Sequence, residues 1–367
     1  MHIGVNDICS TPEVVNVLKI MLTGMIAFII AFLITPIWTH FLYKYKFGIK
    51  IKNNGVQGDQ LQYVNTLHAD KSGTPTMGGV IVWMSIFVLI FASEYLFPIF
   101  AQLFDKGFIA RLDFFSRQQT YLPLFALVTT GVLGLFDDVM SVRGWGSNKG
   151  GGMRFAVRFW WLFGISALGA WWFYSKLGWD IIHIPAIGDF GIGLWYIPLF
   201  IGVILFMAFS SNETDGLDGL NAGILMMAFS AFTIIAFSQN KIDLASFCMA
   251  ISGALLAFLW FNVYPARFFM GDTGAISLGA TLGVVAMLTD SVAVLFIIVF
   301  IYVLESGSAL LQIISKKFFK RKIFLAAPIH HHFEAMGWPE PKVTMRAWIF
   351  TAVMVVLGLI IGLIGMG

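Results

Sequence analysis

Ten long apolar stretches constrain the fold of this chain more than any other feature of its sequence. Each can cross the roughly 30 Å hydrocarbon core of a bilayer as a helix. Only 12% of the 367 residues are charged, whereas soluble proteins carry about 25%, so most of the surface must face lipid. The sequence therefore predicts an all-α, polytopic membrane protein, with 1–367 forming a single membrane domain. The ten stretches are 17–43, 77–104, 121–137, 155–175, 194–210, 219–237, 244–262, 273–289, 292–315 and 346–365.

The distribution of charge predicts the orientation of these spans. Most of the 23 basic residues fall in or beside the loops after the first, third, fifth, seventh and ninth spans, and basic loops are cytoplasmic. An even number of spans then places both termini on the outer, periplasmic side. The segment before the first span has no basic cluster, and the span is too long for a signal peptide. A net charge of +3 without a basic stripe argues against a nucleic-acid partner.

Five unusual polar segments all fall on the side predicted to be cytoplasmic, at helix ends or in loops. The outer loops carry nothing comparable. We therefore expect a functional site on the cytoplasmic face of the membrane. The segments are HADKSGTPTMGG at 68–79, the pair DD at 137–138, NETDGLDGLN at 212–221, NVYPARFFMGDTG at 262–274 and PIHHHFE at 328–334.

The acidic residues of these segments have both structural and functional interpretations. Asp137 and Asp138 end the third predicted span, where they face the negative end of the helix dipole; they are either solvated acids at the membrane edge or ligands of a cation. Asp215 and Asp218 would share one face of a helix that began there, and helix capping explains only one of them. Asp272 opens the eighth span, where an N-cap role alone would explain it.

Taken together, the five carboxylates favour a cation site that works on phosphates. Mg²⁺ prefers oxygen ligands, takes one or two protein carboxylates and completes its shell with substrate phosphates. The lysines and the glycine- and threonine-rich loops nearby suit the phosphates, although GTPTMGG at 73–79 lacks the ending of a P-loop. The consecutive histidines 330–332 cannot all bind one metal. They fit phosphate or sugar contacts, or an exposed polar loop.

Four of these motifs resemble one enzyme family. TPTMGG, NxTDGLDGL, NxxPAxxFMGDTGA and PIHHHFE are similar to those of the phospho-N-acetylmuramoyl-pentapeptide transferases, within the polyprenyl-phosphate N-acetylhexosamine-1-phosphate transferase superfamily. The resemblance implies a Mg²⁺-dependent enzyme of peptidoglycan synthesis in the bacterial inner membrane. Its substrates would be UDP-N-acetylmuramoyl-pentapeptide and undecaprenyl phosphate, and its products lipid I and UMP. Direct transfer and a phospho-enzyme route both remain open, as does a homodimer.

The resemblance also implies roles for individual residues. Asp272 matches the metal ligand, Asp137 the base toward the lipid phosphate, and Asp138 lies beside it, so these three are the predicted catalytic residues. Two positions depart from the family, because Ser141 and Arg158 stand where the family usually has lysines. The positions that match the nucleotide, sugar and diphosphate site are Lys71, Thr76, Asn212, Asp215, Asp218, Phe269, Gln312, His330 and His331.

Two other functions are compatible with parts of the pattern. A sister transferase that loads N-acetylglucosamine-1-phosphate would share the aspartate motifs, but PIHHHFE argues against it. A transporter would also carry acidic residues within its membrane spans, but it would place them near the midplane rather than on one face.

Overall fold

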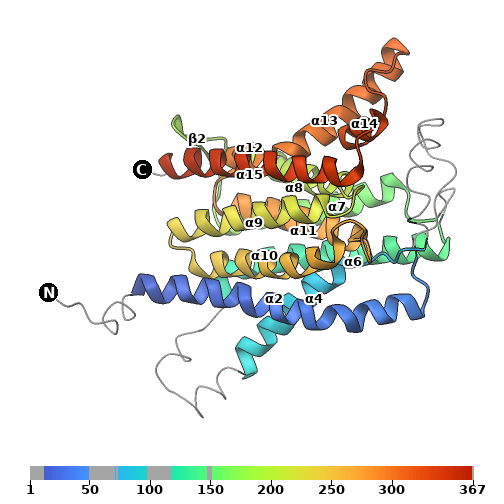
Figure 1. The fold of residues 1–367 in the computed structure, drawn as a ribbon. Helices are drawn as coiled ribbons and strands as arrows, with labels where there is room; N and C mark the ends of the chain where they lie inside the picture. The colour runs from blue at the N-terminus through green and yellow to red at the C-terminus, as the bar shows by residue number, and fades with distance from the viewer. Residues whose placement is uncertain (1–11, 49–70, 72, 97–116, 147–150, 366–367) are drawn as a thin grey trace.

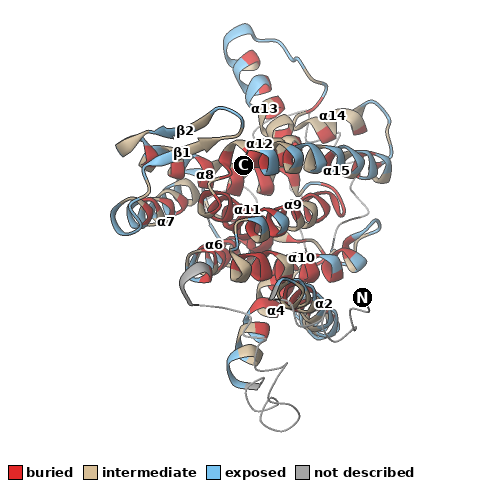
Figure 2. Ribbon diagram, turned by 90° about the vertical axis from the view of Figure 1, so that its left-hand side faces the viewer, coloured by how far each residue is buried: buried red, intermediate tan, exposed pale blue. Residues whose placement is uncertain are grey.

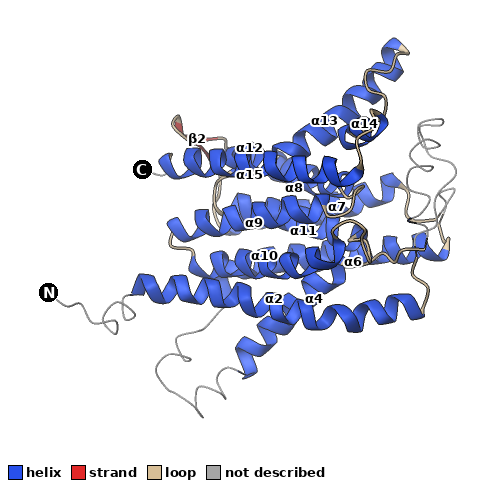
Figure 3. Cartoon of the chain, in the orientation of Figure 1, coloured by secondary structure: helices blue, strands red, loops and turns tan. Residues whose placement is uncertain are grey.

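The computed structural model describes residues 12–48, 71, 73–96, 117–146 and 151–365. Its long helices run side by side in one bundle (Figure 1) and nearly all of its regular structure is helical (Figure 3). The elements are α2 (Pro12–Lys44), α4 (Gly79–Phe91), η2 (Ala92–Leu96), α6 (Arg117–Arg143), α7 (Phe155–Lys176), β1 (Ile181–Ile184), β2 (Gly188–Gly191), η4 (Gly193–Trp195), α8 (Tyr196–Thr214), α9 (Leu220–Ser238), α10 (Ile242–Asn262), α11 (Gly271–Leu288), α12 (Val292–Ile298), α13 (Phe300–Ile314), η5 (Ser315–Phe319), α14 (Ile329–Ala335) and α15 (Glu340–Ile364).

The helices confirm an all-α, polytopic membrane protein. Within the described residues, seven helices are long and apolar enough to cross a bilayer, and α12 with α13 makes an eighth if the bent pair is one span. The two remaining predicted spans fall on α4 with η2 and on α7. The first of them continues beyond residue 96, outside the described residues, and α7 is a 22-residue helix that is not among those eight. The number ten therefore stays a prediction.

Burial separates an inner group of helices from an outer one. In the most apolar part of each helix, 78% of the residues of α10 and 83% of those of α11 are buried. The corresponding shares are 28% in α2 and 17% in α15, and Figure 2 shows the same contrast between inner and outer helices. The exposed side chains of α2 and α15 are largely apolar, as expected of surfaces that face lipid. The outer helix α2 packs closely on α10, where a Cβ added to Gly253 would overlap the Gly24 carbonyl. Small residues permit such close approach between membrane helices.

The ninth predicted span, 292–315, consists of two helices with a break between them. Helices α12 and α13 meet at Val299 with a bend of 79°. The Tyr302 N–H donates to the Val299 carbonyl at 2.8 Å, which makes a tight turn at the start of α13. Neither Pro nor Gly marks this break in the sequence. As a result, α13 leaves the bundle and carries the segment up to α14 with it (Figure 1).

A short antiparallel hairpin lies at the end of the bundle where α2 begins and α15 ends (Figure 1). Its strands β1 and β2 pair with Ile181 opposite Gly191. His183 joins the hairpin to two other elements. Its backbone N–H donates to Asp290 Oδ1 at 3.2 Å, and its Nε2 lies 3.0 Å from the Gly365 carbonyl. The hairpin thereby ties the end of α15 to the turn between α11 and α12.

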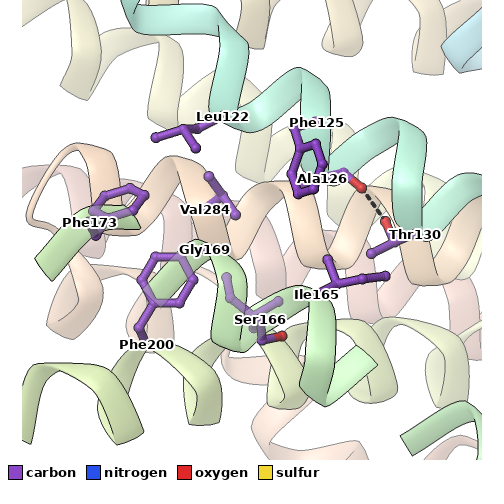
Figure 4. Close-up of a pocket in the computed structure, with 11 residues that line it drawn as sticks. Leu122, Phe125, Ala126, Thr130, Ile165, Ser166, Gly169, Phe173, Phe200 and Val284 are labelled. Carbon is purple, nitrogen blue, oxygen red and sulfur yellow. Dashed lines mark hydrogen bonds between the residues drawn. The ribbon is translucent and has the colours of Figure 1, made fainter. Parts of the chain in front are cut away.

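A small apolar cavity lies between α6, α7, α8 and α11, and is a packing gap rather than a site. The Thr130 hydroxyl at its wall donates to the Ala126 carbonyl at 2.5 Å (Figure 4). The Ser166 hydroxyl donates to the Leu162 carbonyl at 2.7 Å. Both hydroxyls are therefore satisfied within their own helices, and nothing polar is offered to a ligand. The other lining residues are Leu122, Phe125, Ile165, Gly169, Phe173, Phe200, Ile204 and Val284.

Candidate active site

Asp138 links two helices at the centre of the predicted site. Helix α6 continues to Arg143, so the prediction that the aspartate pair ends its span was wrong. The buried Asp138 carboxylate accepts the backbone N–H groups of Asp272 and Thr273, at 3.1 and 3.0 Å, and the Thr273 hydroxyl at 2.6 Å. These amides belong to the first turn of α11, which has no helical partner for them. Asp138 therefore caps α11 from a neighbouring helix.

Asp272 points away from the backbone of its own helix. The N-cap position of α11 is occupied by Met270, which makes no side-chain capping bond. Asp272 lies inside the first turn instead, so a role as N-cap does not explain it. Its Oδ1 accepts a hydrogen bond from Asn212 Nδ2 at 2.6 Å, and its Oδ2 accepts one from Arg158 Nη1 at 2.6 Å. The Asp272 side chain is one-quarter exposed, at 25%. An accessible carboxylate held by its neighbours can bind a ligand.

Arg158 brings two of the predicted catalytic aspartates to one point. Its Nη1 lies 3.2 Å from Asp137 Oδ2 and 2.6 Å from Asp272 Oδ2. Asp137 Oδ1 is fixed from the other side by the Met153 N–H at 2.6 Å. The buried Arg158 Nε has no hydrogen-bond partner in the described part of the chain. Helices α6, α7 and α11 thus direct two carboxylate oxygens onto a single positive atom.

The same two oxygens fit a magnesium ion. Asp137 and Asp272 offer hard oxygen donors around the place that one nitrogen of Arg158 fills. Over the described ranges, no group of three acidic, histidine or cysteine side chains could hold a metal by itself. Mg²⁺ usually takes one or two protein carboxylates and leaves the remaining positions to water and substrate phosphates. The arrangement therefore suits an ion whose binding is completed by substrate.

The loop that carries Asp215 and Asp218 precedes α9, which begins at Leu220. The two side chains do not share a helix face, so that expectation was wrong. Asp215 Oδ2 accepts the Gly271 N–H at 3.2 Å, which joins the loop to the start of α11. Burial, together with the nearby charge of Asp272, raises the pKa of Asp215 well above its ordinary value. Asp218 instead faces Lys71, with its Oδ1 2.6 Å from Nζ.

Lys71 is the centre of a second charged group beside the aspartates. Its Nζ lies 2.6 Å from Asp218 Oδ1, 2.5 Å from Glu340 Oε1 and 5.5 Å from the centre of the Phe269 ring. Thr76, also predicted to bind substrate, is buried; a Cβ on Gly271 would meet its hydroxyl. The structure therefore brings a cation, two carboxylates and an aromatic face together next to the start of α11.

The three histidines form part of the short helix α14 instead of a loop, and each has a different partner. His330 is buried, with Nδ1 2.8 Å from Glu305 Oε2, and His331 Nδ1 lies 2.7 Å from Glu334 Oε2. His332 Nδ1 accepts the N–H of Leu325. Burial lowers the pKa of His330, but the charge and hydrogen bond of Glu305 outweigh it, so its pKa is raised above the usual value.

Gln312, also predicted to bind substrate, makes hydrogen bonds to the segment that follows η5. It is fully buried in α13; its Nε2 donates to the Phe324 carbonyl at 3.0 Å, and its Oε1 accepts the N–H groups of Ile323 and Phe324 at 3.0 and 3.1 Å. The amide is therefore engaged in holding the chain that leads from η5 to α14.

Several residues that contact the predicted site residues were missing from the sequence-based set. Arg158 was noticed only as a departure from the family, and Glu305, Glu334 and Glu340 were not singled out. For Glu305 a signal existed, because an acid within an apolar stretch normally has a buried partner or a function. Glu340 follows Pro339 at a helix start, where an acidic residue looks like an ordinary favourable dipole contact.

Comparison with known proteins identifies the family of this chain. Residues 71–81 match signature 1 of the phospho-N-acetylmuramoyl-pentapeptide transferases, and 121–290 match glycosyl transferase family 4. The transferase of that name from Chloroflexus aggregans is 34% identical, with 94% of this chain and 90% of the relative covered. Those from Clostridium perfringens (strain SM101) and a Geobacillus species are 36% and 33% identical, covering 91% and 95% of this chain and 94% and 98% of the relatives. The chain belongs to the phospho-N-acetylmuramoyl-pentapeptide transferase family.

Proposed function

We propose that this chain transfers phospho-N-acetylmuramoyl-pentapeptide from its UDP derivative to undecaprenyl phosphate, giving lipid I and UMP, at the acidic cluster around Asp272. The transferase activity follows from family membership. One observation supports this location: two carboxylate oxygens, from Asp137 and Asp272, converge on the single nitrogen Arg158 Nη1. Two carboxylates in this arrangement attract a cation, and a bound cation would neutralise phosphate charge, which is most of what phosphoryl transfer requires of a protein.

The nucleotide side of the reaction fits the group around Lys71. The ammonium of Lys71 lies between Asp218 and Glu340 and over the Phe269 ring. In this proposal the Phe269 face supports the uracil base, and Lys71 contacts the phosphates. Asn212, hydrogen-bonded to Asp272, keeps the Asp272 carboxylate oriented toward the diphosphate. The UMP group would then leave on this side of the site.

The acceptor side fits Asp137. Its Oδ1 accepts the Met153 N–H and its Oδ2 faces Arg158 Nη1, so the carboxylate is held in one orientation, and in this proposal the lipid phosphate arrives beside it. Asp137 takes the proton of the undecaprenyl phosphate; a phosphate oxygen then forms a bond to the sugar-linked phosphorus, and the bond to UMP breaks. Asp272 would hold Mg²⁺, which would supply positive charge to the phosphate oxygens when bound.

The protein is a multi-pass protein of the bacterial inner membrane. For its orientation we propose ten spans in one membrane domain of residues 1–367, both termini periplasmic and the acidic cluster on the cytoplasmic side. Two observations support this: α2 begins and α15 ends at the same end of the bundle (Figure 1), and basic residues gather in alternate loops. A homodimer stays a prediction.

The rival within the superfamily is a sister transferase for N-acetylglucosamine-1-phosphate. A test incubates the purified full-length protein with undecaprenyl phosphate, Mg²⁺ and either UDP-N-acetylmuramoyl-pentapeptide or UDP-N-acetylglucosamine. The proposal is supported if UMP and a lipid-linked product form with the muramoyl substrate and do not form with UDP-N-acetylglucosamine. Product from UDP-N-acetylglucosamine alone would favour the rival.

A further inference from the structure

Glu305 and His330 form a buried pair between α13 and α14. Their side chains are only 3% and 1% exposed, and Glu305 Oε2 lies 2.8 Å from His330 Nδ1. The backbone N–H of His330 donates to the same carboxylate at 3.4 Å. Glu305 lies in the first half of α13, just beyond the bend at Val299. The bend therefore places an acidic side chain where it holds both the ring and the backbone of His330.

The other ring nitrogen of His330 is left without a partner. Within the described residues, Nε2 is buried and makes no hydrogen bond. A Cβ built on Gly216 would lie 2.6 Å from this atom, so Nε2 faces the loop between Asp215 and Asp218. Any side chain at position 216 would therefore collide with Nε2. A buried N–H of this kind normally has a partner, and the adjacent loop lines the proposed nucleotide–sugar site.

We propose that Glu305 is a positioning residue that fixes His330 so that its Nε2–H donates to an oxygen of the diphosphate of the nucleotide–sugar substrate. This inference rests on the proposed function, because it requires the substrate diphosphate to lie beside the Asp215–Asp218 loop. The carboxylate binds Nδ1–H, which leaves Nε2 as the atom available to the ligand. Carboxylate partners fix the orientation of ligand-binding histidines in this way in many sites.

The charges around His330 favour an imidazolium ion. Glu305 from α13, Glu334 from α14 and Glu213 from α8 all raise its pKa, and together they outweigh burial, which lowers it. Two basic residues are also near: the ring of His331 is 4.1 Å away between centres, and Arg346 from α15 lines a cavity of about 260 Å³ that His330 also lines. An imidazolium presents N–H donors on both sides, one for Glu305 and one for an anionic oxygen.

A double-mutant cycle tests the proposal in the full-length protein with both substrates and Mg²⁺. We expect Glu305→Gln to lower kcat/KM by about tenfold to a hundredfold, the effect typical of removing a carboxylate that orients a metal-binding histidine. His330→Asn retains an N–H near the position of Nδ1 but lacks Nε2, and should lower kcat/KM at least as much. The double variant should be no worse than His330→Asn alone, because Glu305 acts through His330.

The pH profile separates positioning from a general loss of structure. Because the raised pKa extends the protonated range of His330 to higher pH, activity in the parent should fall as the pH rises through the pKa of His330. Without the Glu305 charge the pKa falls, so the alkaline limb of kcat/KM should move to lower pH in Glu305→Gln. The matched control is Asp243→Asn, which removes a largely buried carboxylate paired with Lys19. It should leave the limb in place.

A second variant keeps the test decisive if Glu305→Gln folds poorly. Gly216→Ala retains the pair but places a methyl group against Nε2. It should lower kcat/KM about tenfold or more in the parent and much less with His330→Asn, because the longer ring is then absent. If His330→Asn is fully active, the site assignment fails and the inference with it. If His330→Asn is impaired while Glu305→Gln keeps parental activity and pH profile, or if their effects multiply, only the role of Glu305 is wrong.

Discussion

The carboxylate of Asp138 accepts the backbone N–H of Asp272 at 3.1 Å, although the two residues are 134 positions apart. This bond makes the position of the proposed metal ligand depend on α6 as well as on its own helix. The side chain of Asp272 is left to bind Asn212 and Arg158. The two adjacent aspartates of α6 thus have different roles: Asp138 holds the start of α11, and Asp137 faces Arg158 and the acidic cluster around Asp272.

Asp138→Asn should therefore reduce both stability and activity. The Asn side chain has one acceptor oxygen, whereas Asp138 accepts three hydrogen bonds, two from backbone amides and one from Thr273. Leaving a buried donor unpaired costs about 1–3 kcal/mol, and a shift of about 1 Å in Asp272 can cost about 10²-fold in rate. Thermal unfolding in detergent and turnover measure the two effects. Parental values for both would show that α11 does not need this cap.

Arg158→Gln should change the dependence on Mg²⁺. Arg158 holds positive charge against Asp137 and Asp272, so removing it leaves the two carboxylates free for a cation. We expect half-maximal activity at a lower Mg²⁺ concentration, with turnover reduced about 10²- to 10³-fold because a stabilising charge is lost. Arg158→Lys keeps the charge and serves as the control. An unchanged Mg²⁺ requirement in Arg158→Gln would separate Arg158 from the metal site.

The sequence was sufficient to predict helices and clusters but not the contacts between them. Apolar length predicted the membrane helices, and motif residues such as Asp137, Asn212 and Asp272 do lie together. The bend at Val299 was not predictable, because no Pro or Gly marks it and the apolar run continues through it. Pairings such as Glu305 with His330 depend on how α13 packs after that bend. Local pattern cannot specify contacts between segments 25 residues apart.

The hairpin at the other end of the bundle should respond to pH. The hydrogen bond to Asp189 is the main cause that raises the pKa of His183. A raised pKa in the folded state gives stability that is fully present below the ordinary histidine value near 6.5, and is lost as the pH rises through the raised value. Hydrogen exchange of 181–191 should therefore speed up at alkaline pH beyond the intrinsic rate change. His183→Gln should abolish this excess; its persistence would assign it elsewhere.

Cysteine labelling tests the proposed orientation. In a Cys9→Ser background, with Cys248 buried, Ile187→Cys in the exposed hairpin turn should react with a membrane-impermeant thiol reagent added to spheroplasts. Lys322→Cys, exposed near the acidic end of the bundle, should react only after permeabilisation. Labelling of both positions from the outside would contradict the orientation, because Lys322 and the acidic cluster near it would then face the periplasm.

The central claim is that Asp272 binds Mg²⁺ at the point where phosphoryl transfer occurs. The most direct measurement is the turnover of Asp272→Asn across a Mg²⁺ titration, with UDP-N-acetylmuramoyl-pentapeptide and undecaprenyl phosphate as substrates. Asp137→Asn is measured in the same way, and the thermal stability of both variants is checked. Asn keeps the size of the side chain, so folding should survive. We expect Asp272→Asn to lose about 10²- to 10³-fold in rate and to require more Mg²⁺, whereas Asp137→Asn should lose turnover but still bind the uridine nucleotide. Parental turnover by Asp272→Asn at limiting Mg²⁺ would contradict the metal assignment.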